Sequence, residues 1–158
     1  MKKALKIIIA VLTVFIAVNV IWFCWAHAKY GKLSLGMKET EFSSFVVPRY
    51  FYTDEEGYDF AVKYPDYLSL TGNMSLGTPT IGENFFTDGL IIWPKLDGRY
   101  ELGVLLYEQN GTDNQGYAVY IDKEGNPLSE EDREIVTRHK ENIEILLKKA
   151  DERWGILD

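Results

Sequence analysis

The sequence predicts an α+β protein, in which a single transmembrane helix precedes a small domain with a four- or five-stranded antiparallel sheet and a long C-terminal amphipathic helix packed on it. An unbroken apolar run of 20 residues occupies positions 7–26. Between residues 45 and 121, short segments rich in β-branched and aromatic side chains are separated by Gly, Pro, Asn and Asp, as in a sheet. From Ser129 to Trp154, apolar residues recur at helical spacing.

The apolar run is long enough to cross a bilayer. Twenty helical residues rise about 30 Å, the thickness of the hydrocarbon core, and no charged residue interrupts the run. Lys2, Lys3 and Lys6 precede it, and clustered lysines keep that end of a span in the cytoplasm. We therefore expect a signal anchor in the cell membrane, with residues 1–6 cytoplasmic, a bilayer-spanning segment at 7–26 and an extracytoplasmic C-terminal part.

A cleaved signal peptide is the alternative interpretation of the same segment. Residues 26–28 are Ala-His-Ala, the small-x-small pattern of a signal-peptidase site, and cleavage after Ala28 would leave a secreted protein. Against cleavage, the run exceeds the roughly 7–15 apolar residues of a cleavable segment. It also ends in the bulky Trp22 and Trp25. Both interpretations send the rest of the chain across the membrane.

Residues 27–44 are polar, contain two glycines and show no periodicity, so we expect a tether between the membrane and a domain at 45–158. Residues 45–52 favour an edge strand, because Pro48 lacks the amide that an inner strand needs. Residues 54–64 are ambiguous. A capping aspartate at the start and a proline after the end favour a short helix, whereas alternating apolar residues favour a strand, and we expect the helix.

Four further strands complete the predicted sheet, at 67–76, 90–93, 99–108 and 117–121. Asp97-Gly98 is a hairpin signal. Residues 109–116 form a polar loop that we expect to be longer than a two-residue hairpin. Strands joined by such short connections pair antiparallel.

The C-terminal helix has signals at both ends. Ser129 with Asp132 resembles a capping box, and acidic residues fill the first turn, where the helix dipole favours them. Gly155 can end the helix in a left-handed conformation. The apolar positions between these ends lie on one face, so the helix should pack on the sheet.

The part of the chain beyond residue 28 is acidic and lacks cysteine. Three of the 17 Lys and Arg residues precede the apolar run, whereas all 24 Asp and Glu follow it, so this part carries a net charge of −10. We expect no nucleic-acid partner, because phosphate binding needs a basic face. The single cysteine, Cys24, lies in the apolar run. A disulfide-free outer domain behind a short lysine leader favours a bacterial origin.

The outer residues carry no recognisable catalytic motif. A nucleophile–base pair needs Ser or Cys beside His, and the two histidines are His27, at the membrane exit, and His139, at the core edge of the predicted helix. Two distant histidines do not supply the ligands of a zinc site. We therefore expect no catalytic residues, no metal site and no cofactor.

Paired carboxylates keep one enzymatic alternative open, because two acids in a groove can hydrolyse a glycan. A hydrolase needs these acids about 5–10 Å apart, with at least one raised pKa. The candidate acids lie in the predicted strands and loops: Glu83, Asp88, Glu101, Glu108 and Asp113.

A cluster of tyrosines is the strongest candidate for a binding surface, since tyrosine offers a large contact area with a polar tip. The competing interpretation is that half of them line the core. The predicted binding residues are these tyrosines and one aspartate of the polar loop: Tyr50, Tyr52, Tyr58, Tyr64, Tyr67 and Asp113. We expect a non-catalytic domain that binds an unidentified protein or cell-wall component. An immunity-type protein that neutralises a basic toxin is the alternative within binding.

Overall fold

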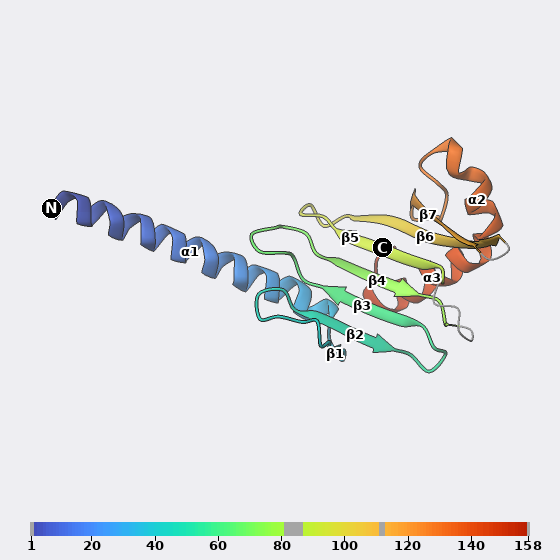
Figure 1. Cartoon of the computed structure of the whole chain (residues 1–158), viewed down its shortest axis with the longest axis horizontal. Coiled ribbons are helices and arrows are strands. Elements are labelled where there is room, and N and C mark those ends of the chain that lie inside the picture. The colour runs from blue at the N-terminus through green and yellow to red at the C-terminus, as the bar shows by residue number, and fades with distance from the viewer. Residues whose placement is uncertain (1, 81–86, 111–112, 158) are drawn as a thin grey trace.

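The computed structural model describes residues 2–80, 87–110 and 113–157. Within these ranges the chain forms one long N-terminal helix, a seven-stranded antiparallel sheet and two C-terminal α-helices (Figure 1). The predicted α+β class and the long apolar N-terminal helix are confirmed. The sheet has more strands than the predicted four or five, and the C-terminal helix is divided.

The sheet is a meander in which each strand pairs with its neighbours in the sequence. Its strands are β1 (Lys38–Glu39), β2 (Arg49–Thr53), β3 (Asp59–Lys63), β4 (Asn73–Gly77), β5 (Gly89–Pro94), β6 (Tyr100–Asn110) and β7 (Asp113–Ile121). Residues 109–110 and 113–116, expected to lie in a loop, instead extend the β6–β7 hairpin as far as the pair Asn110 and Asp113. The prediction of a long loop there is wrong.

One face of the sheet holds the core. Side chains alternate along each strand, so Val62, Met74, Ile92 and Leu106 are buried on the same face. Helix α3 (Lys140–Trp154) crosses this face behind the sheet in Figure 1. No helix among the described residues covers the opposite face.

The C-terminal segment begins with a 3₁₀ turn, η1 (Glu130–Asp132), continues as α2 (Arg133–Arg138) and ends as α3. A single helix was predicted, and the break lies at His139, whose φ and ψ are −101° and 12°. Its ring binds the Asp88 carboxylate, which holds the chain at this point. Gly155 ends α3 in the left-handed conformation, as predicted.

The helix α1 (Lys2–Leu33) continues through the first part of the predicted tether. Ala26 and Tyr30 are buried, and the Tyr30 hydroxyl accepts a hydrogen bond from the Gly72 amide at 2.7 Å. The prediction of a tether at 27–44 is therefore corrected, because residues 27–33 continue α1 and Tyr30 belongs to the core. The physical reason is a stripe of buried side chains spaced four residues apart, Trp22, Ala26 and Tyr30, which docks this end of α1 on the sheet.

The segment 54–64, expected to be a helix, is a turn followed by β3. The Asp54 carboxylate accepts hydrogen bonds from the amides of Glu56 and Tyr58, both at 2.9 Å. Gly57 then adopts a φ of 87° and reverses the chain. Aspartate at a helix N-cap makes the same kind of bond, so the local signal was ambiguous, and pairing of β3 with β2 and β4 decides the outcome.

Candidate functional site

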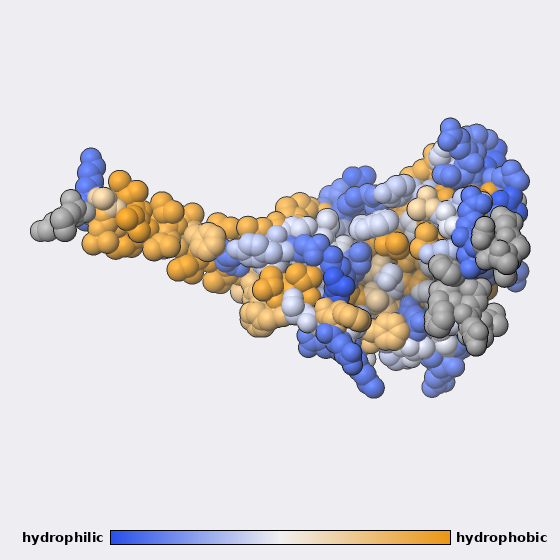
Figure 2. Space-filling model, viewed as in Figure 1, coloured by the Kyte–Doolittle hydropathy of each residue, from blue (hydrophilic) through white to orange (hydrophobic). Residues whose placement is uncertain are grey.

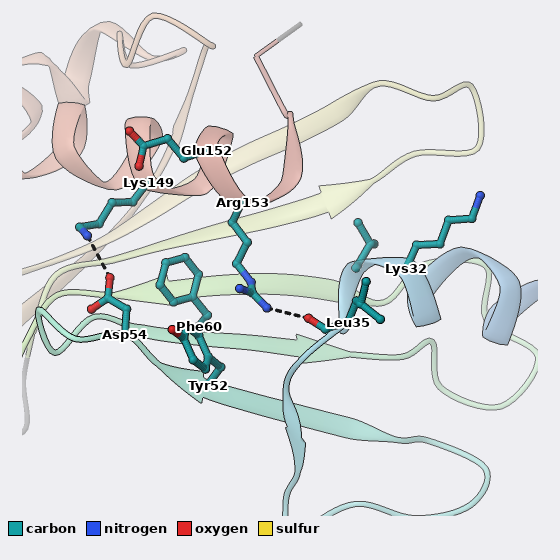
Figure 3. Close-up of a pocket in the computed structure, with 9 residues that line it drawn as sticks. Lys32, Leu35, Tyr52, Asp54, Phe60, Lys149, Glu152 and Arg153 are labelled. Carbon is teal, nitrogen blue, oxygen red and sulfur yellow. Dashed lines mark hydrogen bonds and ion pairs between the residues drawn. The ribbon is translucent and has the colours of Figure 1, made fainter.

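A pocket of about 440 Å³ lies where the end of α1, the β2–β3 hairpin and the C-terminal half of α3 meet. Figure 3 shows its side chains. The residues that line it come from opposite ends of the sequence: Lys32, Leu33, Leu35, Tyr52, Asp54, Phe60, Lys149, Glu152 and Arg153. The fold therefore builds this pocket only after both ends of the chain have packed on the same face of the sheet.

Arg153 is the central cation of the pocket. Its guanidinium lies 4.9 Å from the centre of the Tyr52 ring and 5.4 Å from that of Phe60, an arrangement that stabilises a cation. Its Nη2 donates a hydrogen bond to the Leu35 carbonyl at 3.0 Å. Within the described part of the chain, its Nε is buried without a hydrogen-bond partner and its charge meets no carboxylate. The Nη atoms, whose one hydrogen bond among the described residues goes to Leu35, are the donors open to a ligand.

Lys149 is paired with two carboxylates of the β2–β3 hairpin. Its ammonium lies 2.9 Å from Asp54 and 3.0 Å from Glu56, and 4.3 Å from the centre of the Tyr58 ring. Burial lowers the pKa of Lys149, but hydrogen bonds to the two carboxylates outweigh burial and raise it above its usual range. Lys149 therefore stays protonated and fixes the wall of the pocket beside Arg153.

Asp54 is held as a carboxylate. Burial raises its pKa, but hydrogen bonds from Lys149 and from two backbone amides outweigh burial, so the pKa lies below the ordinary aspartate value. At the rim, Lys32 and Glu152 point away from Arg153 in Figure 3. The pocket therefore combines an inward-facing guanidinium, a lysine paired with two carboxylates and an aromatic floor.

The structure separates the predicted tyrosines into three places. Tyr52 lines the pocket and Tyr58 stacks on Lys149 beside it. Tyr50 and Tyr64 pack on each other at the core, with ring centres 5.6 Å apart. Tyr67 packs on Trp22 of α1, with ring centres 5.6 Å apart.

The sixth predicted residue, Asp113, begins β7, where it pairs with Asn110 at an end of the sheet. Its side chain lies outside the described part of the structure. Sequence reasoning missed Arg153 and Lys149. The available signal was their spacing, since two cations four residues apart extend the apolar stripe of α3 toward its C-terminus.

Three candidate acids of the glycan-hydrolase alternative, Asp88, Glu101 and Glu108, are engaged in other contacts. Asp88 is buried and accepts hydrogen bonds from the Tyr107 amide, His139 Nδ1 and Asn142 Nδ2 at 2.9, 2.7 and 2.8 Å. This carboxylate ties the start of β5 to the α2–α3 junction.

Two further candidate acids, Glu101 and Glu108, lie apart from the Arg153 pocket. Glu101 pairs with Lys95, and Glu108 pairs with Arg138. Glu83 lies outside the described residues. Among the residues that the structure does describe, no group of three His, Cys, Asp or Glu side chains converges in a way that would hold a metal ion.

The pocket around Arg153 is suited to non-covalent recognition of a carboxylate. A guanidinium presents a planar fork of donors that matches a carboxylate, and the aromatic floor holds that fork in place. Comparisons with protein-family models, with curated proteins and with solved structures find no match to this chain.

Proposed function

We propose that the protein is a membrane-anchored extracytoplasmic binding domain, which recognises a carboxylate of a protein or cell-wall peptide through Arg153. The observation that carries the proposal is a guanidinium over the rings of Tyr52 and Phe60, whose Nη atoms make one hydrogen bond among the described residues, to the Leu35 carbonyl. A charge-assisted hydrogen bond contributes about 1.5–3 kcal/mol, enough to make a single such contact decisive for affinity.

The anchor is supported by the surface of α1. This helix is long and apolar enough to cross a membrane, and its side chains from Lys3 to Val18 are exposed. Lysines at its N-terminus favour a cytoplasmic start.

The buried residues of α1 favour retention of the anchor over cleavage after Ala28. Trp22 and Ala26 precede that position and are buried against the domain, so cleavage would uncover the surface they cover. We expect an intact mass of 18.2 kDa for the mature protein. A mature chain that begins at Lys29 would refute the anchor.

Binding is favoured over hydrolysis by the state of Asp54, one of the two carboxylates that line the pocket. A general acid needs a raised pKa, whereas the pKa of Asp54 is lowered by its bonds to Lys149 and to the backbone, which outweigh burial. The aspartate also holds Lys149 in place, so it has a structural role in the pocket wall.

The test uses the full chain in lipid nanodiscs. Peptidoglycan stem peptides and acidic peptides are titrated in two forms, with free and with amidated carboxylates, and affinity is measured by calorimetry. We expect Arg153→Lys, which keeps the charge and loses the planar fork, to weaken binding of the free form about 10-fold or more. The matched control is Arg133→Lys, because Arg133 is exposed and pairs with Glu130. Equal affinity of wild type and Arg153→Lys for every bound peptide would refute the proposed site.

A further inference from the structure

Two loops of the domain present large apolar side chains to solvent. One joins β1 to β2 and the other joins β3 to β4. Five of their apolar side chains, which we call the apolar collar, are between 43% and 80% exposed: Phe45, Val46, Tyr67, Leu68 and Leu70. Leu68 adopts a positive φ of 59°, which is unusual for a leucine. Exposed apolar side chains gathered in this way mark an interaction surface.

Both loops fold back along α1 toward its N-terminus, so that their tips lie beside the helix in Figure 1. Phe45 stacks on Phe23 with ring centres 5.2 Å apart. The Trp22 indole donates a hydrogen bond to the Ser69 carbonyl at 2.7 Å. The Tyr67 hydroxyl donates to the Asn19 side chain. The loops therefore contact α1 from Asn19 onward along one side, while Val20 and Ile21 stay 54% and 68% exposed.

The part of α1 that precedes its first contact with the loops is too short to cross a bilayer by itself. Residues 7–18 of the apolar run number 12, which gives a rise of about 18 Å. Counting from Lys3 adds only about 6 Å, whereas the hydrocarbon core is about 30 Å thick. The distance that residues 7–18 leave uncrossed, roughly 12 Å, matches the rise from Asn19 to Ala26, a stretch that the loops contact at Asn19, Trp22 and Phe23.

The chemistry of the collar suits the boundary between acyl chains and headgroups. Tyr67 and Trp22 are of the types that gather at this depth. Asp66, the acid next to Tyr67, is paired with Lys63 at 2.8 Å. An apolar recess of about 290 Å³ lies between α1 and the loops, lined by Val20, Phe23 and Val46 among others. Figure 2 shows apolar surface passing from α1 onto the adjoining loops.

We propose that the apolar collar inserts into the outer leaflet of the bilayer, so that the domain sits on the membrane through α1 and both loops. This inference rests on the proposed anchor role of α1. The occupant of the surface is lipid, because the collar is continuous with the span and the span is too short without it. Leu33, at the pocket, then lies about 10 Å beyond Ala26 along the helix, outside the hydrocarbon layer.

The test measures the depth of spin labels in the full chain, reconstituted in phosphatidylcholine vesicles. Cys24→Ala removes the native thiol, and single cysteines replace Phe45, Leu70 and Val14 in turn. Leu128, which is 67% exposed on the domain, serves as the control position. Collision rates with oxygen, which concentrates in lipid, are compared with those of a water-soluble nickel chelate.

We expect labels at Val14, Phe45 and Leu70 to favour oxygen at least threefold relative to the label at Leu128. A label at Val14 in lipid with labels at Phe45 and Leu70 in water would refute the collar and leave the anchor standing. A label at Val14 in water would refute the anchor, and the collar with it. Labels at Phe45 and Leu70 that lie equally deep with and without added anionic lipid would support apolar insertion. Labels that enter lipid only when anionic lipid is added would overturn it.

Discussion

The hydroxyl of Tyr30 provides a direct measure of how firmly α1 belongs to the domain. Tyr30 is fully buried, and its hydroxyl accepts a hydrogen bond from the Gly72 amide at 2.7 Å. Tyr30→Phe keeps the ring, which packs with its centre 5.6 Å from that of Tyr64, and removes one oxygen. The Gly72 amide is then left buried without its partner, which costs about 1–3 kcal/mol of unfolding free energy.

The assay is thermal and urea unfolding of the full chain in detergent micelles, followed by circular dichroism. For a domain of this size, that loss lowers Tm by roughly 3–12 °C. Tyr120→Phe is the matched control, because Tyr120 is 53% exposed on the open face of the sheet, and we expect a change within about 0.5 kcal/mol. If Tyr30→Phe is as silent as Tyr120→Phe, α1 is not docked as described and the reasoning fails.

Three further predictions concern other contacts. Gly72→Ala should destabilise the domain by more than about 2 kcal/mol, since the new Cβ would lie 2.2 Å from the Lys63 carbonyl oxygen. The control is Gly31→Ala in α1, whose new Cβ would lie 3.5 Å from the Tyr64 hydroxyl, and we expect it to be neutral or stabilising in the same unfolding assay. The lowered pKa of Asp54 stabilises the fold at pH values above the ordinary aspartate pKa, and this contribution is lost as pH falls through the lowered value. Asp54→Asn should therefore reduce the fall in unfolding free energy between neutral and acidic pH, and a fall equal to that of wild type would contradict this. Asp88→Asn should cost about 2–3 kcal/mol, because an amide cannot accept all three hydrogen bonds that the carboxylate accepts; urea midpoints equal to wild type would contradict it.

The later strands and the end of α3 could be predicted because their signals are local. The alternation of Leu90 and Ile92 with half-buried neighbours is a strand pattern, and Gly98 supplies the positive φ of 87° that ends the hairpin between β5 and β6. Gly155 likewise supplies the left-handed residue after α3. Each of these features depends on residues adjacent in the sequence.

The extension of α1 into the core was missed because composition hides it. Trp22, Ala26 and Tyr30 are spaced four residues apart and are buried on one side, which is the pattern of a docked helix. Their neighbours before Ala28 are almost all apolar, as a membrane span requires. The docked side of the helix therefore cannot be told from the lipid-facing side by an alternation of apolar and polar residues.

The pocket could not be predicted, because its parts come from distant segments. Arg153 and Tyr52 are about 100 residues apart in the sequence, and neither has a local motif that points to the other. Their meeting depends on α3 running back along the sheet until Trp154 reaches the end of α1. Such a contact follows from topology, and local propensity carries no information about it.

The anchor and the pocket share the last turn of α1. The Leu33 carbonyl accepts a hydrogen bond from the Trp154 indole, and the Leu35 carbonyl accepts one from Arg153, both at 3.0 Å. Removal of α1 would therefore take away one wall of the pocket and release the guanidinium that we propose binds the ligand. A truncated domain that lacks α1 would lose affinity even if it stayed folded, so a ligand is sought with the full chain in lipid. For the same reason, Tyr30→Phe, which loosens α1 without touching the pocket, should weaken binding of any peptide that Arg153 recognises.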